Sequence, residues 1–196
     1  YISINFHQKD IKDPLNGSER ILKNTCLHYI KITPPLTPTY SNMAGNSALV
    51  LLSGGQDSAT CLSLACRAHE SILAIAFDYG QRHRIELEKA EKLSSPAGCP
   101  LRVIDATFIS QLSDNALTSD TLPITTEPGQ LPSTFVPGRN LFFLSMAAVI
   151  ARQHKIDTIY TGVCQTDFSG YPDCRADFIK SAEQTINLAM DTRLSI

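Results

Sequence analysis

The feature that most constrains the fold of this chain is a glycine-rich turn between an apolar run and a helical segment. Residues 48–52 (ALVLL) have the length and composition of a buried parallel strand. The turn, residues 53–58, reads SGGQDS, and we predict a helix over 59–66 behind a hydroxyl or carboxylate cap. Glycines allow close backbone approach, and the free N–H groups of a helix start attract anions. The junction is therefore predicted to bind phosphate.

Two other phosphate-binding patterns are absent from the sequence. It contains no G-x-x-x-x-G-K-[ST] and no G-x-G-x-x-G. The alternative for residues 53–58 is a glycine turn that binds no ligand. Two glycines, two hydroxyls and a carboxylate crowded at one strand–helix junction favour the binding site.

Length and composition predict one α/β domain without charged macromolecular partners. The chain has 196 residues, of which 43% are hydrophobic and 18% are charged, as in ordinary globular proteins. Its net charge of −2 provides no electrostatic footprint for nucleic acid or anionic membrane. No apolar run approaches the roughly 20 residues that a membrane span needs. We expect neither nucleic acid nor membrane as a partner.

The six cysteines include no C-x-x-C pair, so the sequence predicts neither a zinc ribbon nor a redox dithiol. Cys61 and Cys66 fall on a predicted helix, where buried thiols are expected. This usage fits a reducing compartment, and we expect a cytoplasmic protein.

The two ends of the chain differ from its middle. Residues 1–42 are polar and proline-rich without periodicity, and Met43 precedes the first predicted strand. We expect residues 1–42 to be an extension outside the native domain, which then covers 43–196. The alternative is a small extension that packs on the domain. We expect residues 191–196 to follow the last helix without a closing element, as in a domain truncated at its C-terminus.

The rest of the pattern alternates strands with helices. Further strands are predicted at 71–77, 101–105 and 158–163, and further helices at 84–94, 140–151 and 176–190. The helix over 140–151 is apolar almost all round, so it is expected to be buried. The polar connection over 113–137 has the length of a lid or binding loop. Such alternation predicts a parallel sheet with ligands at the carboxyl ends of its strands.

Three other segments carry unusual polar residues. They are FDYGQRH at 77–83, FVPGRN at 135–140 and TGVCQTDFSGYPDCR at 161–175. Taken singly, each is explained by a solvated helix start, a turn or a hydrogen-bonded loop. Their joint placement at strand ends and helix starts favours a functional role, because binding residues concentrate on loops held by a rigid sheet.

Together with the turn at 53–58, these segments closely resemble the 7-cyano-7-deazaguanine synthase family of queuosine biosynthesis, in the ATP pyrophosphatase (PP-loop) superfamily. The resemblance covers about residues 46–190 and leaves out 1–42. It implies a Rossmann-like parallel sheet with helices on both faces, similar to the adenine nucleotide alpha hydrolases. It also implies the strand order 3-2-1-4, with the switch point between strands one and four.

The activity implied by this resemblance is that of an ATP-dependent carbon–nitrogen ligase. Such an enzyme converts 7-carboxy-7-deazaguanine and ammonia to the nitrile 7-cyano-7-deazaguanine (preQ0) through an adenylated intermediate. The carboxylate needs activation because hydroxide and oxide are poor leaving groups. The resemblance further implies ATP and Mg²⁺ as cofactors and a homodimer as the assembly.

Site residues follow from the same resemblance. The expected catalytic residues are Ser53, Asp57, Arg82, His83 and Arg139. The residues expected to bind ATP are Leu52, Ser53, Gly54, Gly55, Gln56, Asp57, Ser58, Ala59, Thr60, Cys61 and Leu62. Within this set the two serines and two glycines would hold pyrophosphate, and Asp57 would orient the turn or help to bind Mg²⁺. The cationic side chains would contact phosphate or the substrate carboxylate.

The residues expected to bind the substrate are Asp167, Phe168, Tyr171, Asp173 and Arg175. Asp167 and Asp173 would accept hydrogen bonds from the amino-pyrimidinone edge of the deazaguanine. Tyr171 or Phe168 would stack on its ring.

The chain departs from the family in one respect. The family carries a structural zinc held by four cysteines in a C-terminal segment with C-x-x-C spacing, which this chain lacks, so no metal ligands are predicted here. Two alternative functions stay open. One is a catalytically impaired nucleotide-binding fragment. The other is a different amidating or tRNA-modifying PP-loop enzyme, although tRNA thiolation is expected to need a basic surface and cysteine pairs.

Overall fold

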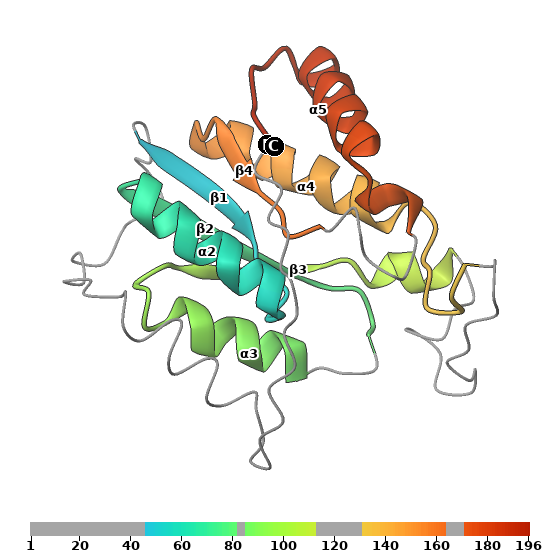
Figure 1. The fold of residues 1–196 in the computed structure, drawn as a ribbon, viewed down its shortest axis with the longest axis horizontal. Helices are drawn as coiled ribbons and strands as arrows, with labels where there is room; N and C mark the ends of the chain where they lie inside the picture. The colour runs from blue at the N-terminus through green and yellow to red at the C-terminus, as the bar shows by residue number, and fades with distance from the viewer. Residues whose placement is uncertain (1–45, 82–84, 113–130, 164–170) are drawn as a thin grey trace, which may run out of the picture.

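The computed structural model describes residues 46–81, 85–112, 131–163 and 171–196. They form an α/β fold with a four-stranded sheet and helices packed on it (Figure 1). The elements, in chain order, are β1 (Ser47–Leu51), α2 (Gln56–Ala68), β2 (Ser71–Asp78), α3 (Ile85–Ser94), β3 (Leu101–Asp105), the 3₁₀ helix η1 (Thr107–Gln111), α4 (Arg139–His154), β4 (Thr158–Tyr160), the 3₁₀ helix η2 (Pro172–Cys174) and α5 (Ala176–Met190). Every predicted strand and helix is present. The expectations for 1–42 and for most of 113–137 lie outside the described residues.

The sheet is parallel, with the order β3-β2-β1-β4. This confirms the order 3-2-1-4. Ala48 of β1 lies opposite Ile72 of β2 on one side and Thr158 of β4 on the other. The chain first winds outward from β1 through β2 to β3 and then returns to the other side of β1. The loops that follow β1 and β4 therefore diverge at a switch point, where α/β sheets bind ligands.

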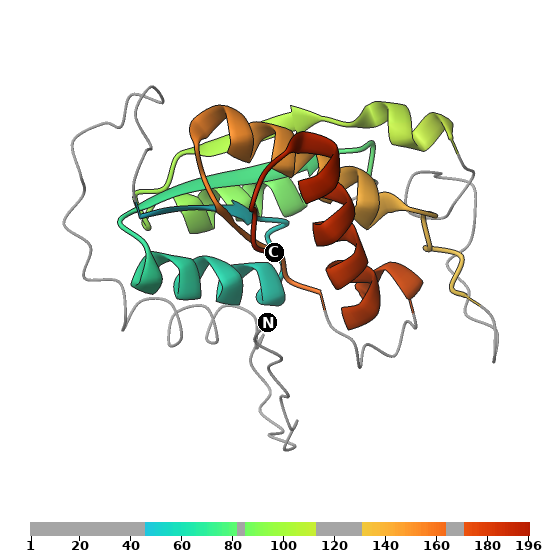
Figure 2. The same cartoon turned by 90° about the horizontal axis from the view of Figure 1, so that it is seen from above.

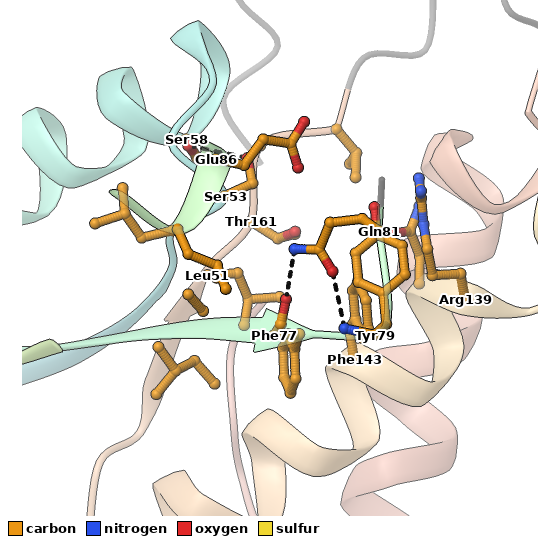
Figure 3. A pocket seen from close by; sticks show the side chains of 17 residues that line it. Leu51, Ser53, Ser58, Phe77, Tyr79, Gln81, Glu86, Arg139, Phe143 and Thr161 are labelled. Carbon is orange, nitrogen blue, oxygen red and sulfur yellow. Dashed lines mark hydrogen bonds between the residues drawn. The ribbon is translucent and has the colours of Figure 1, made fainter. Parts of the chain in front are cut away.

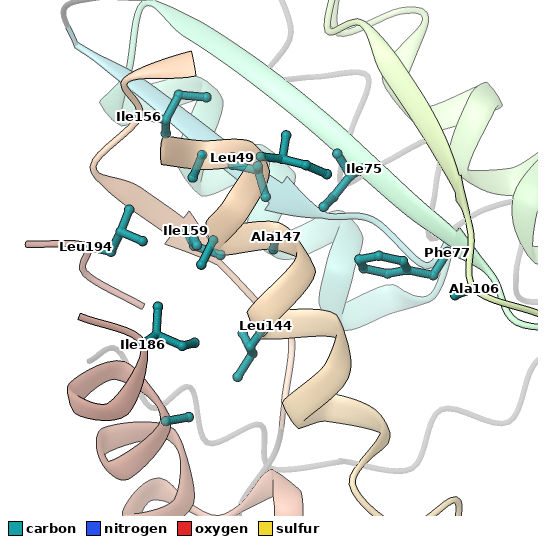
Figure 4. Close-up of a cluster of buried hydrophobic side chains, with 14 of the residues drawn as sticks. Leu49, Ile75, Phe77, Ala106, Leu144, Ala147, Ile156, Ile159, Ile186 and Leu194 are labelled. Carbon is teal, nitrogen blue, oxygen red and sulfur yellow. The ribbon is translucent and has the colours of Figure 1, made fainter. Parts of the chain in front are cut away.

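Alternation along β1 sends its side chains into two separate cores. Leu49 belongs to a core shared with α4 and α5, which includes Leu144 and Ile186 (Figure 4). Val50 belongs to the other core, where Leu62 of α2 also packs. Figure 2 shows the helices on both faces of the sheet. The predicted two-sided α/β architecture is thus confirmed.

Helix α2 begins earlier than predicted. It starts at Gln56 instead of Ala59, and its N-cap is Gly55, with no capping hydrogen bond from a side chain. Asp57 and Ser58 lie inside the first turn of the helix. The expectation of a hydroxyl or carboxylate cap was therefore wrong. The glycine turn ends directly at the helix, so the first-turn N–H groups are left for an external partner.

The expectation that the helix over 140–151 is buried all round was also wrong. In α4, Leu144 is 1% exposed, whereas Leu141 and Val149 are 41% and 47% exposed. The helix packs on one face of the sheet, so only its side toward the sheet and α5 is covered (Figure 1). Apolar residues all round a helix do not reveal which side will find a partner.

The residues after α5 return to the sheet, contrary to expectation. Ser195 forms a parallel bridge with Thr158 of β4, through N–H groups donated by Ile159 and Ser195. Leu194 is 4% exposed and packs in the core beside α5. The segment has too few apolar residues for its pairing to be read from periodicity. No helix among the described residues has the length and apolar character needed to cross a membrane.

Candidate functional site

A pocket of about 240 Å³ lies at the carboxyl ends of β1, β2 and β4 (Figure 3). Four of the residues predicted for the site line it: Leu52, Ser53, Ser58 and Arg139. Ser53 lies in the turn before α2, Ser58 lies in the first turn of that helix, and Arg139 is the first residue of α4. The pocket therefore joins two motifs that are more than 80 residues apart in the sequence.

Serine side chains hold the turn at 53–58 in shape. The Ser58 hydroxyl donates to the Gly55 carbonyl (2.9 Å), and the Ser53 hydroxyl donates to Ser58 Oγ (3.2 Å). The Gly55 N–H points to Ser53 Oγ at 3.4 Å. Ser58 is buried, whereas Ser53 is exposed. Hydrogen bonds within the chain thus hold the turn, and helix α2 directs its free N–H groups and positive dipole end toward it.

The two glycines of the turn serve different purposes. Gly54 has a φ of +82°, and a Cβ there would collide with the Glu86 carbonyl oxygen and lie 2.9 Å from Lys89 Cβ. Gly54 therefore allows close packing on α3, and its role in holding pyrophosphate stays a prediction. Gly55 has a φ of −82°, and a Cβ there would meet only Ser53 Oγ, at 3.5 Å. The space beside Gly55 and Ser53 is therefore open.

The loop after β4 closes the pocket on the other side of β1. A Cβ on Gly162 would lie 2.8 Å from the Asp57 carbonyl carbon and 2.9 Å from the Ser58 nitrogen. Only glycine allows this contact between the loop and the first turn of α2. The contact brings Thr161 and Val163 into the pocket wall.

A buried glutamine fixes the loop after β2. Gln81 is 6% exposed; its Oε1 accepts the Tyr79 N–H (2.9 Å), and its Nε2 donates to the Phe77 carbonyl (3.2 Å). Tyr79 is 8% exposed, and the Arg139 guanidinium carbon lies 5.7 Å from the centre of its ring. Burial raises the pKa of Tyr79, although the positive charge of Arg139 opposes this shift. Tyr79 is thus a neutral phenol at physiological pH.

Glu86 adds a carboxylate that the sequence reasoning did not select. It lies in the first turn of α3, is half-buried and lines the pocket beside Ser53 and Ser58 (Figure 3). Among the described residues, the pocket lining thus contains one cationic side chain, one carboxylate, several hydroxyls and the aromatic rings of Phe77, Tyr79 and Phe143. These groups suit a planar anionic ligand together with phosphate.

The other residues predicted to bind ATP lie around the pocket without lining it. Leu62 is 4% exposed and packs in the core beneath α2, and Asp57 is exposed in the first helical turn. Burial, with a contribution from Asp57, raises the pKa of Cys61 to about 11, so this residue remains a thiol. Direct roles for these three side chains in binding ATP stay predictions.

The predicted substrate-binding residues that the structure describes make their contacts outside the pocket. Asp173 is buried, and its Oδ2 accepts the backbone N–H of Asn140 at 3.1 Å. The Tyr171 ring stacks near Phe135, 5.6 Å between ring centres, and its hydroxyl is 2.5 Å from that of Thr134.

Arg175 is the exposed N-cap residue of α5. Neither Tyr171, Asp173 nor Arg175 lines the pocket. The predicted residues Arg82, His83, Asp167 and Phe168 lie outside the described ranges. Their roles, like contacts of Tyr171, Asp173 and Arg175 with a substrate, stay predictions.

Comparison with known families identifies the chain. Residues 47–196 match the family described as queuosine biosynthesis protein QueC. The chain belongs to this family. It is also 51% identical over 155 residues to the 7-cyano-7-deazaguanine synthase of Lysinibacillus sphaericus (strain C3-41), covering 79% of this chain and 71% of that protein.

Solved structures of synthetases resemble this QueC-family chain more distantly. NMN synthetase from Francisella tularensis matches with a TM-score of 0.45 and 15% identity, over 91% of this chain and 72% of that one. A 4-thiouridine synthetase in complex with RNA and bound ATP matches with a TM-score of 0.42 and 17% identity. That match covers 79% of this chain and 45% of the synthetase.

Gly54 should be required for folding. Gly54→Ala forces a Cβ against α3 at a φ that side chains avoid, and we expect a loss of more than about 1 kcal/mol in unfolding free energy. Urea denaturation measures this loss. Gly55→Ala is the matched control, because φ and space are both permissive there, and it should change stability by less than about 0.5 kcal/mol. Equal effects of the two variants would contradict the distinct roles of these glycines.

Asp173 should contribute to stability as a cap of α4. Asp173→Ala leaves the Asn140 N–H without its acceptor, and we expect a cost of about 1 kcal/mol, as for the loss of a helix N-cap. Asp173→Asn retains an oxygen acceptor and should preserve most of this stability. Thermal unfolding of both variants tests the role. If Asp173→Ala left the melting temperature unchanged, the carboxylate would not act as a cap.

Proposed function

We propose that this QueC-family chain is an ATP-dependent carbon–nitrogen ligase that makes 7-cyano-7-deazaguanine (preQ0) from 7-carboxy-7-deazaguanine and ammonia. The observation that carries the proposal is the pocket itself. It places the serine turn and the start of α2 opposite Arg139, across the ends of β1, β2 and β4 (Figure 3). The family match and the 51% identical synthase support this substrate.

The reaction requires activation of a carboxylate. The carboxylate oxygen attacks the α-phosphorus of ATP, the bond to the bridging oxygen breaks, and pyrophosphate leaves. Ammonia then displaces AMP and loses a proton, which gives the amide. In a second activation the amide oxygen attacks the α-phosphorus of another ATP and pyrophosphate leaves. Loss of both amide N–H protons and of AMP then gives the nitrile. The chain contributes mainly positioning and charge neutralisation to these steps.

The residues of the pocket suit both tasks, the positioning of the reactants and the neutralisation of their charge. The N–H groups at the start of α2, with the Ser53 and Ser58 hydroxyls, would hold the leaving pyrophosphate. Arg139 would neutralise the substrate carboxylate or the α-phosphate. A nucleophilic cysteine is not needed, in agreement with the raised pKa of Cys61.

Mg²⁺ is compatible with the residues around the turn. Glu86 lines the pocket and Asp57 lies in the first turn of α2, so two carboxylates are available to a cation that also binds phosphate oxygens. The ion would supply charge neutralisation on the phosphates. Zinc fits less well, because the described residues contain no group of three or more histidine, cysteine or acidic side chains that could hold a metal. The homodimer remains an expectation from the family, and the cytoplasmic location remains an expectation from the cysteine usage.

The central test is turnover by the purified chain. With ATP, Mg²⁺, ammonium and 7-carboxy-7-deazaguanine, we expect AMP, pyrophosphate and the nitrile, measured by chromatography and mass spectrometry. Omission of ammonium should abolish the nitrile. ATP binding without AMP release would indicate a nucleotide-binding module. AMP release that depends on a different acid would indicate another ligase of the superfamily.

Gly55 provides a test of the nucleotide site that is separate from folding. Gly55→Val fills the space beside Ser53 Oγ, where the phosphate is expected, so ATP affinity should fall at least about tenfold, or 1.4 kcal/mol. Gly55→Ala should weaken binding less. Calorimetry measures both affinities, and thermal unfolding controls for stability. Unchanged ATP affinity in Gly55→Val would exclude this turn as the phosphate site.

A further inference from the structure

The guanidinium of Arg139 is held by an aromatic ring. Within the described ranges, no ion pair joins Arg139 to a carboxylate, and its guanidinium carbon lies 5.7 Å from the centre of the Tyr79 ring. A guanidinium that packs on a ring face keeps most of its in-plane N–H donors for another partner, even though the Arg139 side chain also interacts with the Tyr79 hydroxyl. A carboxylate partner from the protein would instead have occupied those donors.

Tyr79 is itself fixed from several sides. The Gln81 side chain binds the Tyr79 N–H and the Phe77 carbonyl, so it spans the end of β2. The Phe143 ring lies 5.5 Å from the Tyr79 ring and is stacked 4.3 Å from Phe77. Because Phe143 and Arg139 are one helical turn apart on α4, the same contacts fix the start of that helix against β2.

Arg139 lies across the pocket from the serine turn (Figure 3). If pyrophosphate occupies the turn at Ser53 and Ser58, the acid that attacks the α-phosphorus must approach from another side. A cation with free in-plane donors is suited to a carboxylate there, since guanidinium and carboxylate match in a bidentate arrangement. The nearby rings of Tyr79 and Phe143 suit a planar aromatic acid.

We propose that Tyr79 is a positioning residue that, locked by Gln81, holds the Arg139 guanidinium for the carboxylate of a planar aromatic acid. This inference rests on the proposed function and adds to it the element that orients the acid. Tyr79 acts mainly through its ring, and its hydroxyl also interacts with the Arg139 side chain. Gln81 acts through Tyr79.

Binding measurements on single variants provide the first test. Tyr79→Leu should raise the Kd for 7-carboxy-7-deazaguanine about tenfold and leave the Kd for ATP nearly unchanged, as measured by calorimetry. Tyr79→Phe should restore acid binding to within about twofold of the original chain. Gln81→Met, which removes both hydrogen bonds at similar volume, should weaken acid binding in the same direction as Tyr79→Leu. Equal loss in Tyr79→Leu and Tyr79→Phe would overturn the proposal.

A double-mutant cycle separates positioning from a general structural role. In an Arg139→Ala background, Tyr79→Leu should cost acid binding little more, because the group that it positions is gone. Additive losses would overturn the proposal. Tyr160→Leu removes a half-buried ring that does not line the pocket and serves as the control for stability. It should leave acid affinity unchanged.

An NMR measurement on the chain without ligand tests the positioning role of Tyr79 separately from the proposed function. The Arg139 side-chain protons should show an NMR ring-current shift that disappears in Tyr79→Leu and persists in Tyr79→Phe. If the original chain fails to bind 7-carboxy-7-deazaguanine, the proposed substrate is wrong, and this shift still decides whether Tyr79 holds Arg139. Absence of the shift in the original chain would overturn the positioning role.

Discussion

The contact between Gly162 and the first turn of α2 determines the geometry of the whole site. A Cβ at Gly162 would lie 2.8 Å from the Asp57 carbonyl carbon, so the loop after β4 and the phosphate turn after β1 are in direct contact. This contact is possible because β4 pairs beside β1. Without it, the switch point would be a gap between diverging loops. With it, the pocket has a continuous wall from Ser53 to Val163.

The backbone of the site does much of the expected binding. The N–H groups at the start of α2 are oriented by the fold, and the Ser53 and Ser58 hydroxyls fix the turn. Among the described residues, few charged side chains are then needed to bind a phosphate. Arg139 and Glu86 both line the pocket without an ion pair between them, so each charge can serve a ligand. A preformed anion site of this kind requires little reorganisation when a phosphate enters.

The sequence predicted the sheet and four of the residues that line the pocket, whereas other packing roles became visible only in the structure. Apolar runs such as 71–77 mark buried strands, and the turn at 53–58 marks a helix start, because both signals are local. The role of Asp173 depends on contacts distant in sequence: a carboxylate near a helix start can bind a substrate or cap a helix, and here it caps α4. Glu86 was missed because its pattern is that of an ordinary charged helix, and only the packing of α3 on Gly54 brings it to the pocket.

The serine turn at 53–58 and Arg139 belong to different elements of the fold, and this separation has a chemical consequence. The serine turn follows β1, whereas Arg139 opens α4, which packs on the opposite face of the sheet. The leaving pyrophosphate and the acid would therefore be held by separate parts of the fold. These parts meet at the carboxyl ends of the strands. In-line displacement at phosphorus needs the attacking and leaving oxygens on opposite sides of that atom. We expect a sheet that presents the serine turn and Arg139 from opposite faces to suit this arrangement, with Arg139 beside Tyr79, whose N–H binds Gln81.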